Sequence, residues 1–187
     1  VVGAVLLAVL LRAWNVDLMS IWQDEGLSLY RSALDLSGIL GGVIPLGDLM
    51  TQDVHPPLYF LILAAWSRLL GDGTWFAKWL SLLASLPAVP LAWALARRTV
   101  DVSAARVAAP LVALSPLYLW YSQEIRSYAL VVTLGLLAAY LLSRALAPRA
   151  SDTPRVRVGL LAACGAASAA LVWTHYLGFL IVAFEAA

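Results

Sequence analysis

Long runs of apolar residues constrain the fold of this chain more than any other feature of its sequence. Four runs, at about 74–96, 104–121, 126–146 and 158–182, are close to the roughly 20 residues that a helix needs to cross a bilayer. Charged residues make up 12% of the chain, about half of the ~25% found in soluble domains. The sequence therefore predicts an all-α fold, a polytopic transmembrane helix bundle.

A further apolar run, shorter than these four, occupies residues 1–14. It is too short to cross a membrane, and we interpret it as a span truncated at its start. Arg12 and Trp14 stand at its end, where we expect interface anchors, with the cation reaching the lipid headgroups. The chain has no initiator Met and stops at Phe184-Glu-Ala-Ala without a capping signal. We therefore expect residues 1–187 to form the N-terminal part of a single membrane domain.

Residues 15–73 form an outer loop, and residues 20–60 within it hold five of the eleven acidic residues of the chain. Apolar residues from Leu27 to Leu40 recur at near-helical spacing, which predicts a short interfacial helix. Gly38, Gly41 and Gly42 are expected to end this helix. A second short turn is expected at Leu46 to Met50. The apolar stretch 57–70 favours a re-entrant or interfacial helix, and a full crossing stays open as the alternative.

Clusters of cations predict how the spans are oriented. They lie in two connections between spans and comprise Arg97, Arg98, Arg106, Arg144, Arg149, Arg155 and Arg157. Because basic residues favour the cytoplasmic side, both connections are expected inside, with loop 15–73 and turn 122–127 together outside. We therefore expect an integral protein of a bacterial inner membrane or plasma membrane, with a functional site that faces the extracytoplasmic side.

Asp24 and Glu25 are adjacent acids that follow Trp22 directly. Two interpretations stay open for this pair. Asp24 can cap a helix that begins near Gly26, with Glu25 stabilised by the positive end of the helix dipole. Alternatively, a carboxylate at the outer mouth of the bundle can take a proton from an incoming hydroxyl group.

The segment Asp53-Val-His55-Pro56-Pro57 fixes φ at two successive positions and admits a helix directly behind it, because proline is favoured in the first helical turn. Asp53 and His55 can simply cap that helix. A histidine held rigidly at a helix start also suits anion binding, general acid chemistry or metal coordination.

A tight turn between Tyr121 and Tyr128 places Glu124 and Arg126 between two apolar runs. One interpretation is a surface ion pair, which contributes little stability. The other is a substrate path in which Arg126 binds a phosphate, since polar residues at span ends often mark such paths. Lys78 lies on the same outer side, where it can neutralise the same anion or reach the headgroups.

His175 lies about 17 residues into the last predicted run, near its outer third. A single histidine in a membrane helix is often a hydrogen-bonded core residue. The depth of His175 also allows it to join the other polar groups at the outer face.

Three motifs, taken together, resemble the protein O-mannosyltransferase-like membrane glycosyltransferases of the C-type fold, whose relatives include the aminoarabinose transferases that modify lipid A. They are the Asp24-Glu25 pair, the segment from Asp53 through Pro57, and the turn Ser-Gln-Glu124-x-Arg126-x-Tyr. The resemblance implies that residues 1–187 are the N-terminal part of one glycosyltransferase domain. It also implies transfer of a sugar from a polyprenyl-phosphate donor to a hydroxyl acceptor on a protein, lipid or glycan, with inversion at the anomeric carbon.

The resemblance also suggests roles for single residues. Asp24 corresponds to the proposed catalytic base, and Glu25 beside it shapes the acceptor site. Arg126, His55 and Lys78 are the candidates for binding the donor phosphate, and His55 stands where aminoarabinose transferases carry a lysine. Further substrate-site candidates are Asp53, Glu124, Tyr128 and His175.

No cofactor is required by this scheme. A divalent metal bound by Asp53, His55 and Glu124 is a weaker alternative. The expected partners are the lipid donor, the hydroxyl acceptor and membrane lipid, while a formal net charge of +1 gives no reason to expect nucleic acid.

The main alternative function is a transporter or flippase of a lipid-linked or small polar substrate. Such proteins commonly show inverted repeats and helices broken near the membrane midplane. The sequence shows neither signal, and its polar residues gather near one face. A non-catalytic membrane scaffold is a further alternative, which predicts that the loop acids can all be neutralised without effect.

Overall fold

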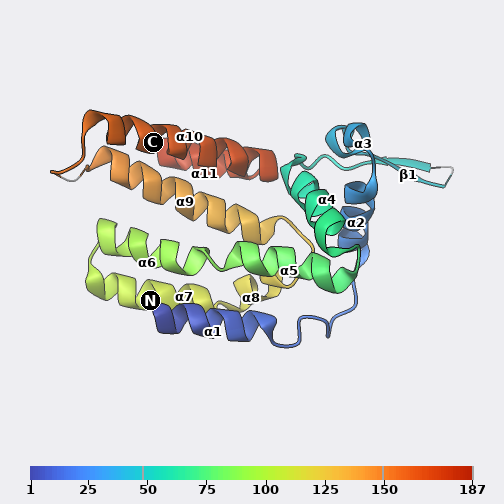
Figure 1. The fold of residues 1–187 in the computed structure, drawn as a ribbon, viewed down its shortest axis with the longest axis horizontal. Helices are drawn as coiled ribbons and strands as arrows, with labels where there is room; N and C mark the ends of the chain where they lie inside the picture. The colour runs from blue at the N-terminus through green and yellow to red at the C-terminus, as the bar shows by residue number, and fades with distance from the viewer. Residues whose placement is uncertain (48, 149, 187) are drawn as a thin grey trace.

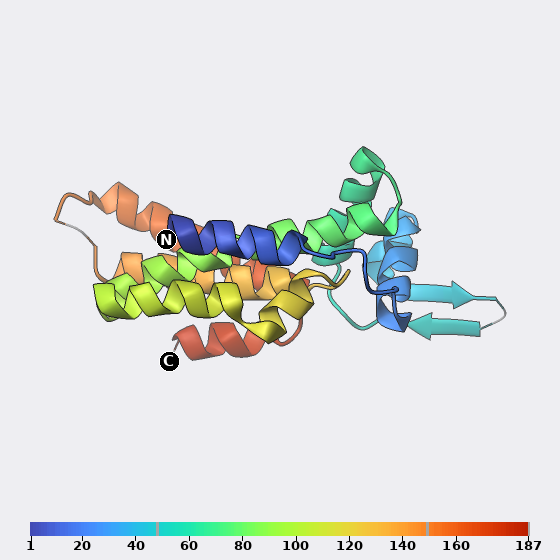
Figure 2. The same cartoon turned by 90° about the horizontal axis from the view of Figure 1, so that it is seen from below.

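In the computed structural model, which describes residues 1–47, 49–148 and 150–186, the chain forms a helix bundle with a group of short elements at one end (Figures 1 and 2). The bundle contains α1 (Val2–Ala13), α5 (Thr74–Ser85), α6 (Ala88–Thr99), α7 (Val102–Leu114), α8 (Pro116–Ser122), α9 (Tyr128–Leu146), α10 (Pro154–Thr174) and α11 (Gly178–Ala186). The group at the end contains α2 (Gln23–Ala33), α3 (Leu36–Gly41), β1 (Val43–Leu46), β2 (Leu49–Gln52) and α4 (Leu58–Leu70). The predicted all-α membrane bundle is confirmed, and the described residues add one β-hairpin to it.

Three helical segments of the described chain are long and apolar enough to cross a membrane, namely Thr74–Thr99, Tyr128–Leu146 and Pro154–Thr174. The first joins α5 and α6 into one segment of 26 residues, which agrees with the run predicted at 74–96. The run predicted at 104–121 forms α7 and α8, which meet at a bend of 52°.

The bend between α7 and α8 follows from Pro116, which has no N–H to donate to the carbonyl of Val112. The side chain of Arg12, on α1, supplies the missing donors: Nη2 donates to Val112 O at 3.2 Å and Nη1 to Ala113 O at 3.1 Å. The expectation that Arg12 anchors the interface is therefore wrong. Its side chain is fully buried in the bundle because it satisfies carbonyls that the bend leaves open.

The last predicted span, 158–182, is wrong at its C-terminal end. Helix α10 ends at Thr174, and α11 packs back against α10 and α9 (Figure 1). Gly178 permits this reversal, since a Cβ atom at that position would lie 2.7 Å from the carbonyl oxygen of Leu171. His175 consequently lies in the connection after the span, at its C-cap, and not within it.

The outer loop contains two helices where one was predicted between Leu27 and Leu40. The side chain of Asp35 accepts a hydrogen bond from Gly38 N at 2.8 Å and so starts α3 as a separate helix. The short turn predicted at Leu46 to Met50 belongs to an antiparallel hairpin, in which Leu46 pairs with Leu49 and Val43 with Gln52. Gly42, with a positive φ of 67°, ends α3 before that hairpin.

Helix α4 occupies residues 58–70, nearly the stretch predicted, and its 13 residues are fewer than a span needs. It packs against α2, α5 and α10 at the end of the bundle that carries the hairpin (Figure 1). A hydrophobic core joins this end to the bundle and is formed by Ile39, Tyr59, Phe60, Leu63, Ala64, Ala77 and Ile125. The outer loop and the turn after α8 are therefore held together by one core.

The arginine-rich connections lie at the opposite end of the bundle from α2, α3 and the hairpin (Figures 1 and 2). They join α6 to α7 and α9 to α10. Arg98, in the last turn of α6, donates to Ser143 O at 2.9 Å, and Arg144 forms an ion pair with Asp152 at 3.1 Å. Arg149, which the sequence assigned to the same cluster, lies outside the described residues.

Candidate active site

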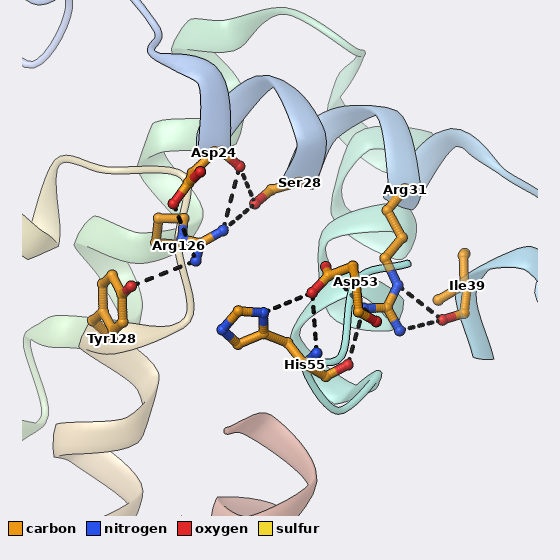
Figure 3. A network of polar contacts seen from close by, with 8 residues as sticks. All are labelled: Asp24, Ser28, Arg31, Ile39, Asp53, His55, Arg126 and Tyr128. Carbon is orange, nitrogen blue, oxygen red and sulfur yellow. Dashed lines mark hydrogen bonds and ion pairs between the residues drawn. The ribbon is translucent and has the colours of Figure 1, made fainter. Parts of the chain in front are cut away.

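Three segments converge at the end of the bundle that carries the hairpin: the first turns of α2, the turn after α8 and the segment before α4. Figure 3 shows Asp24, Arg126 and Tyr128 to one side, and the pair of Asp53 and His55 to the other. The sequence predicted all five of these residues as candidates.

Glu25 joins two of these segments. Its side chain is 3% exposed, Oε2 accepts a hydrogen bond from Trp22 N at 3.1 Å, and Oε1 accepts one from Ile125 N at 2.8 Å. The N-cap of α2 is Trp22, so Asp24 lies within the first helical turn and does not occupy the cap position considered for it. Because both carboxylate oxygens bind backbone N–H groups, Glu25 holds the turn after α8 against the start of α2.

Asp24 presents a more accessible carboxylate. Its side chain is 39% exposed, and Oδ2 lies 3.7 Å from Nη2 of Arg126, which makes a long ion pair. The carboxylate borders a cavity of about 200 Å³ that it shares with Asp53, His55, Arg126 and residues of the hairpin. An accessible carboxylate that faces a cavity has the freedom to accept a proton from a bound group.

Arg126 is buried, yet it is only loosely bound. Its Nη1 lies 3.4 Å from both Asp24 O and Ser28 Oγ, and its Nη2 lies 3.4 Å from the hydroxyl of Tyr128. Its Nε is buried without a hydrogen-bond partner in the part of the chain that the structure describes. The surface ion pair considered for Glu124 and Arg126 does not form, since Arg126 faces Asp24. A guanidinium with long contacts and an unpaired N–H is suited to bind an anion.

Arg31 is a site residue that sequence reasoning missed. The i,i+4 spacing of Arg31 and Asp35 in the sequence suggests a surface pair. The side chain of Arg31 is instead 1% exposed, and its Nη1 lies 2.9 Å from Oδ2 of Asp53. Arg31 also donates to Ile39 O at 3.1 and 2.7 Å and to His55 O at 2.9 Å. It therefore fixes the segment before α4 on α2 and α3, and no local pattern indicates that role.

Asp53 in turn orients His55. Oδ1 of Asp53 lies 2.6 Å from Nδ1 of His55 and accepts a second hydrogen bond from His55 N at 3.0 Å. Burial alone would raise the pKa of Asp53, but the hydrogen bonds from His55 and Arg31 outweigh it and hold the pKa well below its usual range. The ionised carboxylate favours a proton on Nδ1, which leaves Nε2 of His55 for a bound group.

His175 lies beside His55, which brings together two histidines that are distant in sequence. Their ring centroids are 5.1 Å apart, and the ring of His175 is 5.8 Å from that of Tyr128. Nδ1 of His175 accepts a hydrogen bond from Leu177 N at 3.1 Å. Burial lowers the pKa of His175, and electrostatic interactions with His55 and Arg126 lower it further.

A larger cavity of about 470 Å³ lies on the other side of the first turn of α2 and is bordered by Glu25, Lys78 and Glu124. Lys78 is 2% exposed, and its Nζ donates to Met19 O at 2.7 Å, so its ammonium group does not reach the headgroups. Glu124 is 8% exposed, and its Oε1 accepts a hydrogen bond from Nε1 of Trp120 at 2.5 Å. Burial raises the pKa of Glu124, and the charge of Glu25 raises it further.

An apolar groove of about 480 Å³ adjoins the 470 Å³ cavity. Its lining consists mainly of valine and leucine from α7, α8 and α9, and Tyr121 and Tyr128 border both spaces. The groove lies at the bend between α7 and α8. The molecule thus combines an apolar groove with a cavity that charged side chains border, at one end of the bundle.

The metal alternative grouped Asp53, His55 and Glu124. Asp53 and His55 bond to each other, whereas Glu124 bonds to Trp120 beside the other cavity. Across the described residues, no three His, Cys, Asp or Glu side chains are arranged to hold a metal ion.

Comparisons with known proteins give one family and one fold. The family model described as dolichyl-phosphate-mannose-protein mannosyltransferase matches residues 54–185. The crystal structure of ArnT from Cupriavidus metallidurans in the apo state aligns with a TM-score of 0.71 and 21% identity, over 95% of this chain and 33% of that chain. The structure of the same protein bound to undecaprenyl phosphate aligns with a TM-score of 0.67 and 20% identity, over 96% of this chain and 33% of that chain. This chain therefore spans about a third of the length of the structures it matches. A search of curated proteins gives no match.

Proposed function

Because this chain belongs to the dolichyl-phosphate-mannose-protein mannosyltransferase family, we propose that it transfers a sugar from a polyprenyl-phosphate carrier to a hydroxyl acceptor. The observation that carries this proposal is the carboxylate of Asp24, which is accessible, faces a cavity and, among the described residues, makes only a long ion pair with Arg126. A hydroxyl group is a weak nucleophile, and a carboxylate in this position can remove its proton as it attacks.

The apolar groove and the adjoining cavity fit the two parts of the donor. A polyprenyl chain is apolar and a sugar phosphate is polar, so the donor needs an apolar groove that opens into a polar space. The relative from Cupriavidus metallidurans binds undecaprenyl phosphate, which supports the same class of carrier here. Tyr121 and Tyr128, which border both spaces, would lie near the junction of lipid and phosphate.

The transfer step uses charges of both signs. The acceptor hydroxyl attacks the anomeric carbon and gives its proton to Asp24, a carbon–oxygen bond forms, and the bond to the phosphate oxygen breaks with its electron pair on the phosphate. Lys78, which borders the larger cavity, and Arg126, which contacts the hydroxyl of Tyr128, would stabilise the developing negative charge on that leaving phosphate. His55, the third candidate for this role, borders the cavity of Asp24. Attack from the face opposite the phosphate inverts the anomeric configuration.

Glu25 acts in this scheme through position. By holding the turn after α8 on the first turn of α2, it would keep Asp24 and Arg126 at a constant separation. Asp53 would likewise hold the ring of His55 in a fixed orientation through the hydrogen bond to Nδ1. The acceptor, which is a protein, a lipid or a glycan, would approach Asp24 from the cavity that the hairpin borders.

The arginine-rich connections support an extracytoplasmic location for this chemistry. They lie at the end of the bundle opposite to α2, whose first turn carries Asp24, and basic connections favour the cytoplasm. The site would then face the outside of a bacterial inner membrane or plasma membrane.

Transport of a lipid-linked or small polar substrate is the second candidate function. One observation favours it: the break between α7 and α8, since broken helices are common in transporters. The charged residues of the site, however, lie beyond that break at one end of the bundle. This arrangement favours chemistry at a membrane face over passage through the bundle.

The test compares the complete wild-type protein with Asp24→Asn for transfer of labelled sugar from polyprenyl-phosphate donors to acceptors in membranes. Asparagine keeps the size of the side chain but cannot accept the proton, so we expect a loss of about 10²- to 10⁴-fold. Asp17→Asn, which changes an exposed acid near the same face, is the matched control and should transfer normally. Equal transfer by wild type and Asp24→Asn would exclude Asp24 as the base, and a wild type that transfers no sugar would favour transport.

A further inference from the structure

Glu124 has a polar atom that nothing in the described protein uses. The residue is 8% exposed, and Trp120 donates to its Oε1, but its Oε2 is buried without a hydrogen-bond partner among the residues that the structure describes. The residue borders the 470 Å³ cavity. An unpaired buried carboxyl oxygen is destabilising, so its presence in a residue that borders a cavity suggests that a bound molecule supplies the missing partner.

The location of this cavity indicates which part of the substrate reaches Glu124. The cavity shares Tyr121 and Tyr128 with the apolar groove, whereas Asp24 borders the other cavity. A donor whose lipid chain lies in the groove would therefore carry its polar end into the cavity of Glu124. The acceptor would approach from the side of Asp24.

The chemistry of Oε2 indicates which group it binds. As a carboxylate oxygen it accepts a hydrogen bond, and as a protonated carboxyl it can donate one. A sugar hydroxyl both donates and accepts, so it complements either form, whereas a phosphate can only accept and an ammonium group can only donate. The aromatic rings of Trp22 and Trp120 also border the cavity and offer apolar faces to the ring of a sugar.

We propose that Glu124 determines sugar specificity by forming a hydrogen bond between its Oε2 and a hydroxyl group of the sugar on the lipid donor. This inference rests on the proposed function, because it assigns the cavity to the donor of a glycosyl transfer. It adds a contact to the sugar itself, which is separate from the base and from the groups that bind the phosphate.

The test measures binding, so it is independent of transfer. The complete protein is reconstituted in nanodiscs, and Kd is measured for undecaprenyl phosphate and for undecaprenyl-phosphate sugars carrying mannose, glucose, arabinose or an amino-pentose. The ratio of the two affinities isolates the contribution of the sugar. Glu124→Leu should weaken binding of the preferred glycosylated carrier by roughly 5- to 150-fold, the effect of leaving one buried hydroxyl unpaired, and should leave undecaprenyl phosphate binding nearly constant.

Two further variants separate a sugar contact from a structural role. Glu124→Gln keeps a group that can donate and accept, so it should retain most of the preference for the glycosylated carrier. Trp120→Phe removes only the donor to Oε1 and should retain more of the preference than Glu124→Leu does. If Trp120→Phe and Glu124→Leu lose the preference equally, Glu124 acts only by holding Trp120 and the proposal is wrong.

The remaining outcomes also decide the matter. If Glu124→Leu weakens both carriers in parallel, or weakens neither, the contact to the sugar does not exist. The proposed sugar contact is also overturned if the wild type binds the bare and the glycosylated carriers equally. A wild type that prefers a glycosylated carrier but never transfers its sugar overturns the glycosyltransferase proposal and leaves the sugar contact standing.

Discussion

Replacement of Arg31 by methionine should loosen the outer loop without unfolding the bundle. Methionine keeps much of the length and apolar character of the arginine stem but removes every donor. The change breaks the ion pair with Asp53 at 2.9 Å and three hydrogen bonds to the carbonyls of Ile39 and His55. It also removes the cation that stacks 4.1 Å from the ring of Phe60.

The free-energy cost of Arg31→Met follows from the burial of Arg31 and Asp53. Removing one member of a buried ion pair costs about 3–5 kcal/mol, because the other charge stays behind uncompensated. The side chain of Asp53 is 14% exposed, so water can partly solvate it and the lower end of that range applies. A local cost of about 3 kcal/mol corresponds to a change of roughly 150-fold in the opening equilibrium.

Hydrogen–deuterium exchange measures this local opening. In Arg31→Met, we expect exchange of the amides in residues 36–55 to accelerate by about two orders of magnitude, while the amides of α9 exchange as in wild type. Arg68→Met is the matched control, since Arg68 is an exposed arginine on α4 at the same end of the bundle. If residues 36–55 exchange alike in both variants, or if α9 accelerates equally, the ion pair does not hold the loop as we infer.

Three further predictions concern stability. The pKa of Asp53 is held below its usual range, so its ion pair contributes fully at neutral pH and is lost as the pH falls below about 4. The protection factors of the loop amides, which correct exchange for its intrinsic pH dependence, should therefore be constant from pH 7 to pH 5 and fall only in stronger acid, and a fall already at pH 6 would contradict this. Arg12→Leu leaves the carbonyls of Val112 and Ala113 unpaired at the α7–α8 bend and should cost about 1–3 kcal/mol for each, visible as a lower Tm in detergent than that of Arg68→Leu. Gly178→Ala would press a methyl group against a backbone carbonyl of α10, so α11 should become accessible to protease while α9 and α10 stay resistant.

Much of the architecture could be predicted from the sequence, because apolar runs and clustered arginines depend on local composition. Helices α5, α6 and α9 appear close to their predicted positions, and the arginine-rich connections lie together at one end. The candidate residues were also visible, since an acid or a histidine stands out within an apolar chain. The sequence did not predict the reversal of the chain after His175, the separation of α2 from α3 or the two strands of the hairpin.

The partners of the charged residues could be known only from the tertiary structure. Arg126 faces Asp24 and not its sequence neighbour Glu124, and Glu25 binds a backbone N–H 100 residues away. Arg12 turns into the bundle because a proline more than 100 residues later leaves carbonyls without a donor. Sequence determines that a charge is present and that an apolar chain must satisfy it, since an unpaired polar group in an apolar surrounding is costly. Which group satisfies it depends on which segments the fold brings into contact, and those segments can lie 100 residues apart in the sequence.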